Sequence, residues 1–292
     1  MSQTARSPSP DEVLKPYVPR VVIQWLRETP AASHRAIDGT LAFVDISGFT
    51  ALTELLARRG KVGAELMRDT LDGVFTALLD EAYEWGAGLL KWGGDALLLF
   101  FDGAGHEERA ARAMWELQRT IASVGRLSVG SKTIVLRMSI GVATGPVDFF
   151  VAGSVHRELL VAGPTVTETV SIEAIADAGE IGLSPALAQR LGPAVVGSAP
   201  AGITLLTAPP EAVRERAPDV GSVAGLDVAA WIPVATRAHV LLERSEPEHR
   251  TITAAFIDLM DTDALLARLG PAAFADALDA RLVAIQEAAL RY

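Results

Sequence analysis

The chain has 292 residues, of which 50% are hydrophobic and 21% charged, a composition that is typical of a globular protein and excludes an intrinsically disordered one. Its formal net charge of −10, from 26 basic and 36 acidic residues, excludes the broad basic surface on which nucleic-acid binding depends. Cysteine is absent, which excludes disulfides, thiolate metal sites and cysteine nucleophiles.

The N-terminal stretch 1–11 is polar and rich in serine and proline, which predicts a disordered lead and not a signal peptide. The most apolar stretch of the chain, Ala96 to Phe101, is far too short to span a bilayer. We therefore expect a cytoplasmic protein with no membrane or nucleic-acid partner.

The most regular segments follow one another in the order strand, helix, strand, strand, helix, strand. The apolar run Leu41 to Ile46 predicts a buried strand, and helical spacing follows it with a break at Gly60. The other expected elements are helices over 48–59, 62–85 and 107–124 and strands over 89–92, 96–101 and 133–143, the last ended by the turn residues 144–146. This order is the ferredoxin-like βαββαβ pattern, so we expect an α+β palm fold.

Shorter elements surround this palm. We expect a helix over 21–27, strands over 149–152, 158–161 and 180–183, a helix over 165–176, and a strand-like piece over 203–207. In the helix over 62–85, the side chains expected to face the core are Leu66, Leu71, Val74, Leu78 and Leu79.

Four segments are expected along the chain: a disordered or helical lead (1–37), a first domain (38–191), a tail and linker (192–248) and the start of a truncated second copy (249–292). The last rests on a repeat, since Thr251 to Leu259 parallels Thr40 to Ile46, with Phe-x-Asp-aliphatic in both, and helical spacing follows each. The alternative is a chance similarity between two apolar strands.

Two aspartates stand at the edges of apolar strands. Asp45 follows Leu41 to Val44, and Asp95 precedes the run that begins at Ala96. A carboxylate at such an edge is costly to bury unless a cation meets it, and neighbouring glycines allow backbone to approach a ligand. The pair therefore predicts two divalent metals facing a polyphosphate. The alternative is a helix cap at Asp45 and a turn residue at Asp95.

Three other motifs are incomplete. Residues 125–133 nearly spell a P-loop, but the lysine is one place late and a strand follows instead of a helix. Gly93-Gly94-Asp95 is similar to the start of the diguanylate cyclase signature, but the Glu-Phe of that signature and the Asn-Asp of the preceding helix are missing. Residues 152–156 lack the second glycine of a nucleophile elbow.

Three motifs in order resemble the class III nucleotide cyclases. They are Phe43-Val44-Asp45-Ile46-Ser47-Gly48-Phe49-Thr50, Lys91-Trp92-Gly93-Gly94-Asp95 and Ser139-Ile140-Gly141-Val142-Ala143-Thr144-Gly145. The resemblance covers about residues 38 to 191 and resumes at His249. The arrangement is most similar to the first half of the tandem soluble (bicarbonate-type) adenylyl cyclases and their bacterial relatives.

The resemblance implies a mechanism. Two Mg²⁺ or Mn²⁺ ions would be held by Asp45, Asp95 and the carbonyl of Ile46, one activating the ribose 3′-hydroxyl and the other clamping the phosphates. The product would be a 3′,5′-cyclic nucleotide with release of pyrophosphate, from ATP or alternatively GTP. The phosphate-binding amides would come from Ser47, Gly48, Phe49 and Thr50, at the start of a helix.

Several positions depart from the family pattern. Thr167 and Ser171 stand where the family's catalytic half carries an asparagine and an arginine, and Leu160 replaces the polar residue that reads the base. Ser139 stands where a phosphate-binding cation is usual, and Arg137, on the same strand face, is the substitute that we expect.

Lys91 matches the base-recognition lysine of the family, or alternatively lines a regulatory bicarbonate site, an idea weakened by Val170 in place of the expected arginine. Together the departures imply the metal-supplying half of an adenylate cyclase-type lyase. A complementary domain, in the same longer chain or in a dimer partner, would complete it, and little activity is expected from this polypeptide alone. The alternative is a non-catalytic, cyclase-like module for nucleotide binding or dimerisation.

Overall fold

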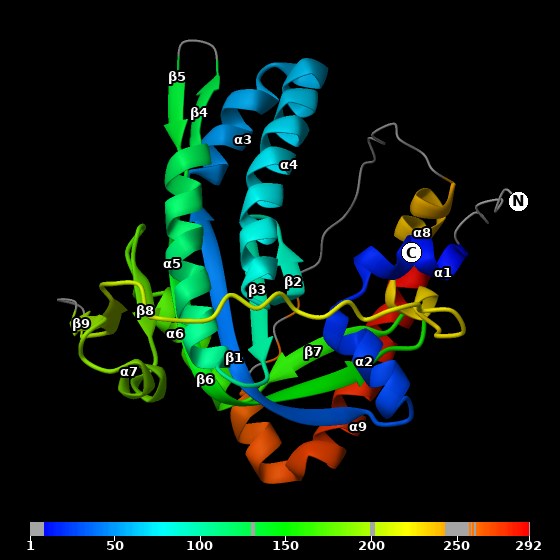
Figure 1. The fold of residues 1–292 in the computed structure, drawn as a ribbon. Helices are drawn as coiled ribbons and strands as arrows, with labels where there is room; N and C mark the ends of the chain where they lie inside the picture. Colours follow the sequence, from blue (N-terminus) through cyan, green and yellow to red (C-terminus); the bar gives the residue numbers. More distant parts are fainter. Residues whose placement is uncertain are drawn as a thin grey trace, which may run out of the picture. The chain divides into compact units, whose positions relative to one another are not determined.

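The computed structural model of the chain describes residues 9–129, 132–198, 202–242, 257, 259 and 261–291. The chain divides into two compact units. Figure 1 labels the helices and strands of both. Unit 1 comprises Met1–Ala36, Asp148–Gly163 and Asp219–Tyr292, and unit 2 comprises Ile37–Val147 and Pro164–Pro218. The predicted repeat strand, Thr251 to Leu259 with Asp258, lies outside the described residues except at positions 257 and 259.

Unit 2 is built on a mixed β-sheet. Its strands are β1 (His34–Ser47), β2 (Gly88–Gly93), β3 (Ala96–Asp102), β6 (Arg137–Ala152), β8 (Ile181–Leu183), β9 (Val196–Ser198) and β10 (Thr204–Leu206). They lie in the order β2-β3-β1-β6-β8-β10-β9. Strand β1 is antiparallel to β3, with Asp45 opposite Ala96, whereas β6 and β8 are parallel. Because helices and a mostly antiparallel sheet alternate along the chain, the predicted α+β class is confirmed.

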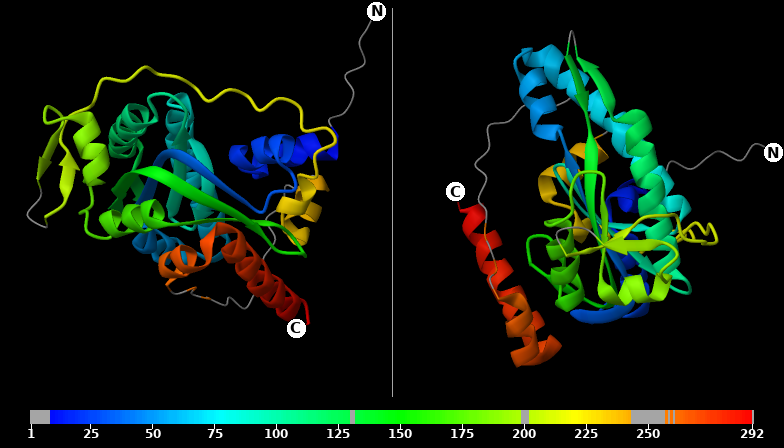
Figure 2. Two further views of the ribbon diagram at one scale, coloured as in Figure 1. Left: turned by 90° about the horizontal axis from the view of Figure 1, so that it is seen from below. Right: turned by 90° about the vertical axis from the view of Figure 1, so that its left-hand side faces the viewer.

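Helices cover both faces of this sheet. Helix α4 (Gly60–Glu84) and helix α5 (His106–Val124) lie side by side on one face (Figures 1 and 2). Their apolar residues and the even-numbered residues 42, 44 and 46 of β1 form the main core of unit 2. Helix α6 (Pro164–Glu173) packs on β6 from the other face, so closely that a Cβ on Gly141 would lie 2.2 Å from the carbonyl oxygen of Thr169. Helix α3 (Phe49–Ala57) and helix α7 (Pro185–Leu191) complete unit 2.

The core-facing side of α4 differs from the prediction at one position. Val74 and Leu78 are buried, and Leu71 and Leu79 pack against the core, but Leu66 is 42% exposed, so its predicted burial is wrong. The stripe that reaches the protein interior continues from Leu71 to Met67, four residues back, which packs beside α3. Leu66 is one residue off that stripe, about 100° around the helix, and therefore faces solvent.

The predicted strand over 133–143 is two strands in the structure. Strand β5 (Lys132–Val135) forms a separate antiparallel pair with β4 (Arg126–Val129), and β6 begins only at Arg137. Strand β6 then runs on through the predicted turn at 144–146 and includes the predicted short strand 149–152. Exposed Pro146 interrupts no core packing there, and its carbonyl oxygen accepts a hydrogen bond from the Thr165 hydroxyl at 2.8 Å.

Unit 1 contains the end of β6 and the strand that pairs with it. Strand β7 (Glu158–Ala162) is antiparallel to residues 148–152 of β6. The helices of unit 1 are α1 (Pro10–Leu14), η1 (Lys15–Tyr17), α2 (Arg20–Glu28), η2 (Ala229–Trp231), α8 (Val234–Leu241) and α9 (Thr262–Leu290). Helix α1 begins inside the lead that was predicted to be disordered, because Ser9 caps it and Pro10 occupies its first position.

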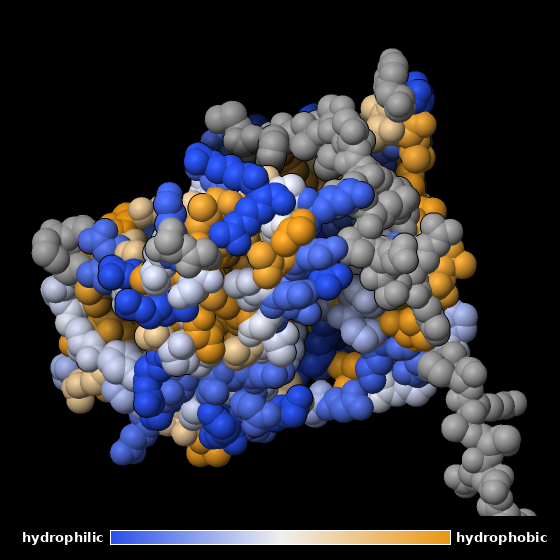
Figure 3. Space-filling view, turned by 90° about the horizontal axis from the view of Figure 1, so that it is seen from above, coloured by the Kyte–Doolittle hydropathy of each residue, from blue (hydrophilic) through white to orange (hydrophobic). Residues whose placement is uncertain are grey.

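Polar and apolar residues are intermixed over the face drawn in Figure 3, as expected for a chain that is 50% hydrophobic and 21% charged. Among the helices that the structure describes, none has the length and apolarity needed to cross a membrane.

Candidate active site

Asp45 is placed by the alternation of strand β1. Its neighbours Val44 and Ile46 point into the helix-covered core and are almost fully buried. Because successive side chains of a strand point to opposite faces, Asp45 lies on the other face of the sheet, where it is half-buried. The strand ends two residues later, at Ser47. The apolar run that predicted the strand therefore also brings this carboxylate to the sheet surface.

Asp95 is placed by the β2–β3 hairpin beside it. The hairpin turns at Gly94, whose φ of +68° is readily adopted only by glycine, and Asp95 is the next residue. The Ile46 amide donates a hydrogen bond of 3.2 Å to the Asp95 carbonyl oxygen, which fixes the turn to the end of β1. The structure thus brings Asp45 and Asp95 to the same edge, as the two strand-edge motifs predicted.

The electrostatics of this edge are unfavourable in the absence of a cation. Burial raises the pKa of the Asp45 carboxyl above its ordinary value, and the negative charges of Asp95 and Glu173 raise it further. Both charges that act on Asp45 are negative. Holding Asp45 ionised next to them costs free energy, so this edge of the sheet favours a positively charged ligand.

Glu173 is a site residue that the sequence analysis missed. It is the last residue of α6, and its carboxylate accepts a hydrogen bond of 2.7 Å from the Ser139 hydroxyl on β6. The available signal was the helix face, since Glu173 lies four residues after Thr169, which is fully buried on the sheet side of α6. The family resemblance implies a phosphate-binding cation at position 139. The residue there is instead a serine whose hydroxyl is hydrogen-bonded to a carboxylate.

The oxygen donors at this edge fit a hard divalent cation. The oxygens of the Asp45 and Asp95 carboxylates and of the Ile46 main-chain carbonyl are of the types that Mg²⁺ and Mn²⁺ prefer. Within the described ranges, however, no group of three or more acidic or histidine side chains is arranged to hold a metal. Glu173 therefore contributes charge to the site, and any further ligands would have to come from main chain, water or a bound nucleotide.

Helix α3 begins at Phe49, four residues after Asp45 in the chain. Gly48 is the N-cap residue at φ +92°, and its carbonyl oxygen accepts the first helical hydrogen bond, from the Leu52 amide at 3.1 Å. Within the described chain no side chain caps this helix, so the first-turn amides of Phe49 and Thr50 are available for an anion. The Ser47 hydroxyl is directed instead to the carbonyl oxygen of Arg137, at 3.4 Å.

The two predicted cations lie on exposed positions. Lys91 pairs with Leu98 across the hairpin, next to a register shift between Leu89 and Lys91. Arg137 is the first residue of β6, two residues before Ser139 and so on the same strand face. Both residues are exposed to solvent.

The positions that depart from the family pattern provide no compensating cation. Thr167 and Ser171 are exposed on α6, and the Ser171 hydroxyl donates to the Thr167 carbonyl oxygen at 2.7 Å. Val170 is 43% exposed. Leu160 belongs to unit 1, where it packs against an apolar cluster.

Comparison with known proteins identifies the family. The model of the adenylate and guanylate cyclase catalytic domain matches residues 32–204, more than half of the chain. Adenylate cyclase type 10 of Mus musculus is 27% identical over 187 residues, and that of Homo sapiens is 29% identical over 166 residues. These alignments cover 58% and 51% of this chain but 11% and 9% of the relatives, so the chain spans about a tenth of their length.

Solved structures share the fold. The adenylyl cyclase CyaB from P. aeruginosa aligns with a TM-score of 0.50 and 20% identity over 60% of this chain and 96% of its own. The guanylate cyclase domain of RhGC from Catenaria anguillulae, in complex with GTP, aligns with a TM-score of 0.51 and 21% identity over 61% of this chain and 100% of its own. The protein therefore belongs to the family of adenylate and guanylate cyclase catalytic domains.

Proposed function

We propose that this chain is the metal-supplying half of a nucleotide cyclase that converts ATP to 3′,5′-cyclic AMP and pyrophosphate. The observation that carries the proposal is the pairing of Asp45 with Asp95 at a half-buried edge where every charge that shifts the Asp45 pKa is negative. Such a pair is destabilising unless cations join it. ATP is the preferred substrate because the curated relatives are adenylate cyclases, and GTP is the alternative to be assayed beside it.

Different groups at this edge of the sheet would bind the metal ions and the phosphates. Asp45, Asp95 and the Ile46 carbonyl would hold two Mg²⁺ or Mn²⁺ ions, whose chemistry when bound is to polarise a ribose hydroxyl and neutralise phosphate charge. The amides at the start of α3, from Ser47 to Thr50, would orient phosphate oxygens.

The exposed cations would bind the rest of the nucleotide. Lys91 would contact the base, and Arg137 would contact phosphate from the face that it shares with Ser139.

A complementary domain is part of the proposal, because α6 offers Thr167 and Ser171 where transition-state stabilisation needs a cation. The C-terminal segment supports a second copy within the same protein. Helix α9 breaks at Gly270 (φ +73°) between a short and a long helical part, as the chain breaks at Gly60 (φ +59°) between α3 and α4. The residues before each break also agree, Leu55-Leu56-Ala57-Arg58-Arg59-Gly60 and Leu265-Leu266-Ala267-Arg268-Leu269-Gly270.

A second candidate function is a cyclase-like module that binds nucleotide without turning it over. The observation in its favour is the hydrogen bond from Ser139 to Glu173, which places an anion where a triphosphate would need a cation. Under this reading the protein would act through dimerisation or nucleotide-dependent regulation of a partner.

Metal binding is tested first, by thermal unfolding of the full chain with increasing Mn²⁺. Saturation at a hundred times the dissociation constant contributes about 2.7 kcal/mol, because the ion binds only the folded state. That stabilisation corresponds to roughly 5–10 °C in melting temperature. Asp45→Asn should abolish the shift, whereas Asp72→Asn, which neutralises an exposed aspartate on α4, should retain it.

Turnover is tested by mixing the chain with a class III cyclase domain that carries the asparagine and arginine missing from α6. We expect cyclic nucleotide from the mixture with Mn²⁺ and ATP, and none when Asp45→Asn replaces the wild type. Product formation that survives Asp45→Asn would reject the metal role. Nucleotide binding without product in any mixture would support the second candidate.

A further inference from the structure

Helix α9 packs on the β6–β7 hairpin of unit 1 through an apolar cluster. Phe274 is fully buried, and its ring meets the ring of Phe150 on β6 edge-on, with centroids 4.9 Å apart. The cluster comprises Phe150 and Ala162 from the hairpin and Leu266, Phe274, Ala275 and Leu278 from α9. An aromatic side chain that is buried in this way contributes several kcal/mol to holding the two elements together.

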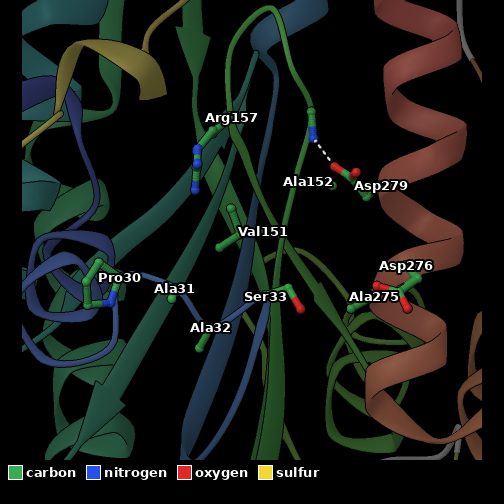
Figure 4. Close-up of a pocket in the computed structure, with 11 residues that line it drawn as sticks. Pro30, Ala31, Ala32, Ser33, Val151, Ala152, Arg157, Ala275, Asp276 and Asp279 are labelled. Atoms are coloured by element: carbon green, nitrogen blue, oxygen red, sulfur yellow. Dashed lines mark hydrogen bonds between the residues drawn. The ribbon is translucent and has the colours of Figure 1, made fainter.

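Two polar side chains of α9 bind the backbone of the hairpin turn. Gln286, which is only 8% exposed, accepts hydrogen bonds from the amides of Ser154 (3.0 Å) and Val155 (3.1 Å). Its amide nitrogen donates to the His156 carbonyl oxygen at 2.9 Å. Asp279 accepts a bond of 2.9 Å from the Gly153 amide, drawn as the dashed line in Figure 4. Four successive residues of the turn are thus hydrogen-bonded to one helix.

The turn is also shaped to admit this helix. Gly153 has a φ of +104°, and a Cβ at this position would lie 2.7 Å from the side-chain nitrogen of Gln286 and 2.4 Å from the His156 carbonyl oxygen. Any larger residue would push the Gln286 amide away. The buried Gln286 amide both donates and accepts hydrogen bonds, so it determines the position of α9 along the hairpin. A shifted or different helix would leave those polar groups unpaired.

We propose that the β6–β7 hairpin is a docking surface for an amphipathic helix, that its occupant is α9 of the same chain, and that Gln286 is the residue that determines specificity. This contact between α9 and the hairpin, called the joint below, attaches the segment after residue 261 to the hairpin of the first cyclase domain. It requires no metal, nucleotide or turnover, so its test is independent of the proposed function.

An open pocket of about 340 Å³ lies beside the joint (Figure 4). Arg157, next to the hairpin turn, and Asp276, on α9, are exposed residues of its lining. Arg157 lies on the hairpin side of the joint and Asp276 on the α9 side, and neither takes part in the hydrogen bonds of Gln286. They are therefore suitable positions for a proximity probe.

Hydrogen exchange of the full-length chain tests the specificity of the joint. The variant Gln286→Leu keeps the side-chain size but removes the side-chain amide. The backbone amide hydrogens of Ser154 and Val155 should then exchange roughly tenfold faster or more, since each loses a hydrogen bond to a buried acceptor. Glu287→Leu, at the exposed neighbouring position, is the matched control and should leave both rates unchanged. Equal rates in wild type and Gln286→Leu, or equal acceleration by both variants, would overturn the assignment of Gln286.

Cross-linking tests whether α9 docks within its own chain. Because the protein contains no cysteine, the double variant Arg157→Cys/Asp276→Cys can be treated with a short bismaleimide without background reaction. We expect an internal link that leaves a monomer on a denaturing gel. Dimers as the main product would show that α9 docks on a second copy, and the absence of any link would show that it does not dock; either result would overturn the proposed joint.

Discussion

Gly141→Ala tests whether the backbone of α6 rests directly on β6. An added methyl group at this position would lie 2.2 Å from the Thr169 carbonyl oxygen and 2.6 Å from the Glu173 amide nitrogen. Carbon atoms in good contact with their neighbours lie about 3.5–4 Å away, so α6 would have to retreat by roughly 1 Å. Overpacking of this kind typically costs about 1–3 kcal/mol of unfolding free energy. The same retreat would stretch the bond of 2.7 Å between Ser139 and Glu173.

Urea unfolding of the variant and of a matched control gives the measurement. Gly73→Ala is the control, because Gly73 is exposed on α4 and an added Cβ there meets no atom within 4 Å. It should stabilise the protein by about 0.5–1 kcal/mol through helix propensity alone. An unfolding free energy of Gly141→Ala within about 0.5 kcal/mol of the wild-type value, the typical scatter for neutral substitutions, would contradict direct contact between α6 and β6.

Three further outcomes are expected. Phe274→Ala should lower the unfolding free energy by about 3–5 kcal/mol, since it empties a fully buried site and removes the ring contact with Phe150; a loss below 1 kcal/mol in urea unfolding would contradict the packing of α9. Gly48→Ala should cost about 1–2 kcal/mol at φ +92°, where the new Cβ would also lie 2.9 Å from the Val135 carbonyl oxygen, and an unchanged melting temperature would exclude this conformation. Burial, reinforced by Asp80, raises the pKa of Tyr83, so its contribution to stability is complete below the ordinary tyrosine pKa of 10.0 and is lost as the pH rises through the raised value. Tyr83→Phe should therefore flatten the alkaline loss of stability, and parallel pH profiles for the variant and wild type would contradict the shift.

Local patterns were sufficient to predict much of the fold and the two aspartates of the candidate site. The strand ending near Asp45, the hairpin at Gly94 and the long helices were all predictable from short-range spacing, because each follows from alternation, turn chemistry or helical period within one segment. The strand-edge positions of Asp45 and Asp95 predicted that the two share one site, and the pairing of Asp45 with Ala96 brings them close together. The family match agrees with these motifs.

Other features depended on contacts between distant segments. Leu66 and Met67 are adjacent and both apolar, so only the position of α3 decides which of them is buried. Strand β6 passes through its predicted turn because the segments on both sides are paired, residues 140–142 with β8 and residues 148–152 with β7. The spacing rules used on a single segment contain neither kind of information.

What the sequence by itself determined was the order of the main strands and helices of unit 2, the α+β class, and the two aspartates on which the candidate site is built. Only the tertiary structure decided that Glu173 adds its charge to Asp45 from 128 positions along the chain, and that Gln286 binds the turn at 153–156. The reason is physical: backbone conformation is governed by neighbours in sequence, whereas charge and buried hydrogen bonds act through space between whichever groups packing brings together.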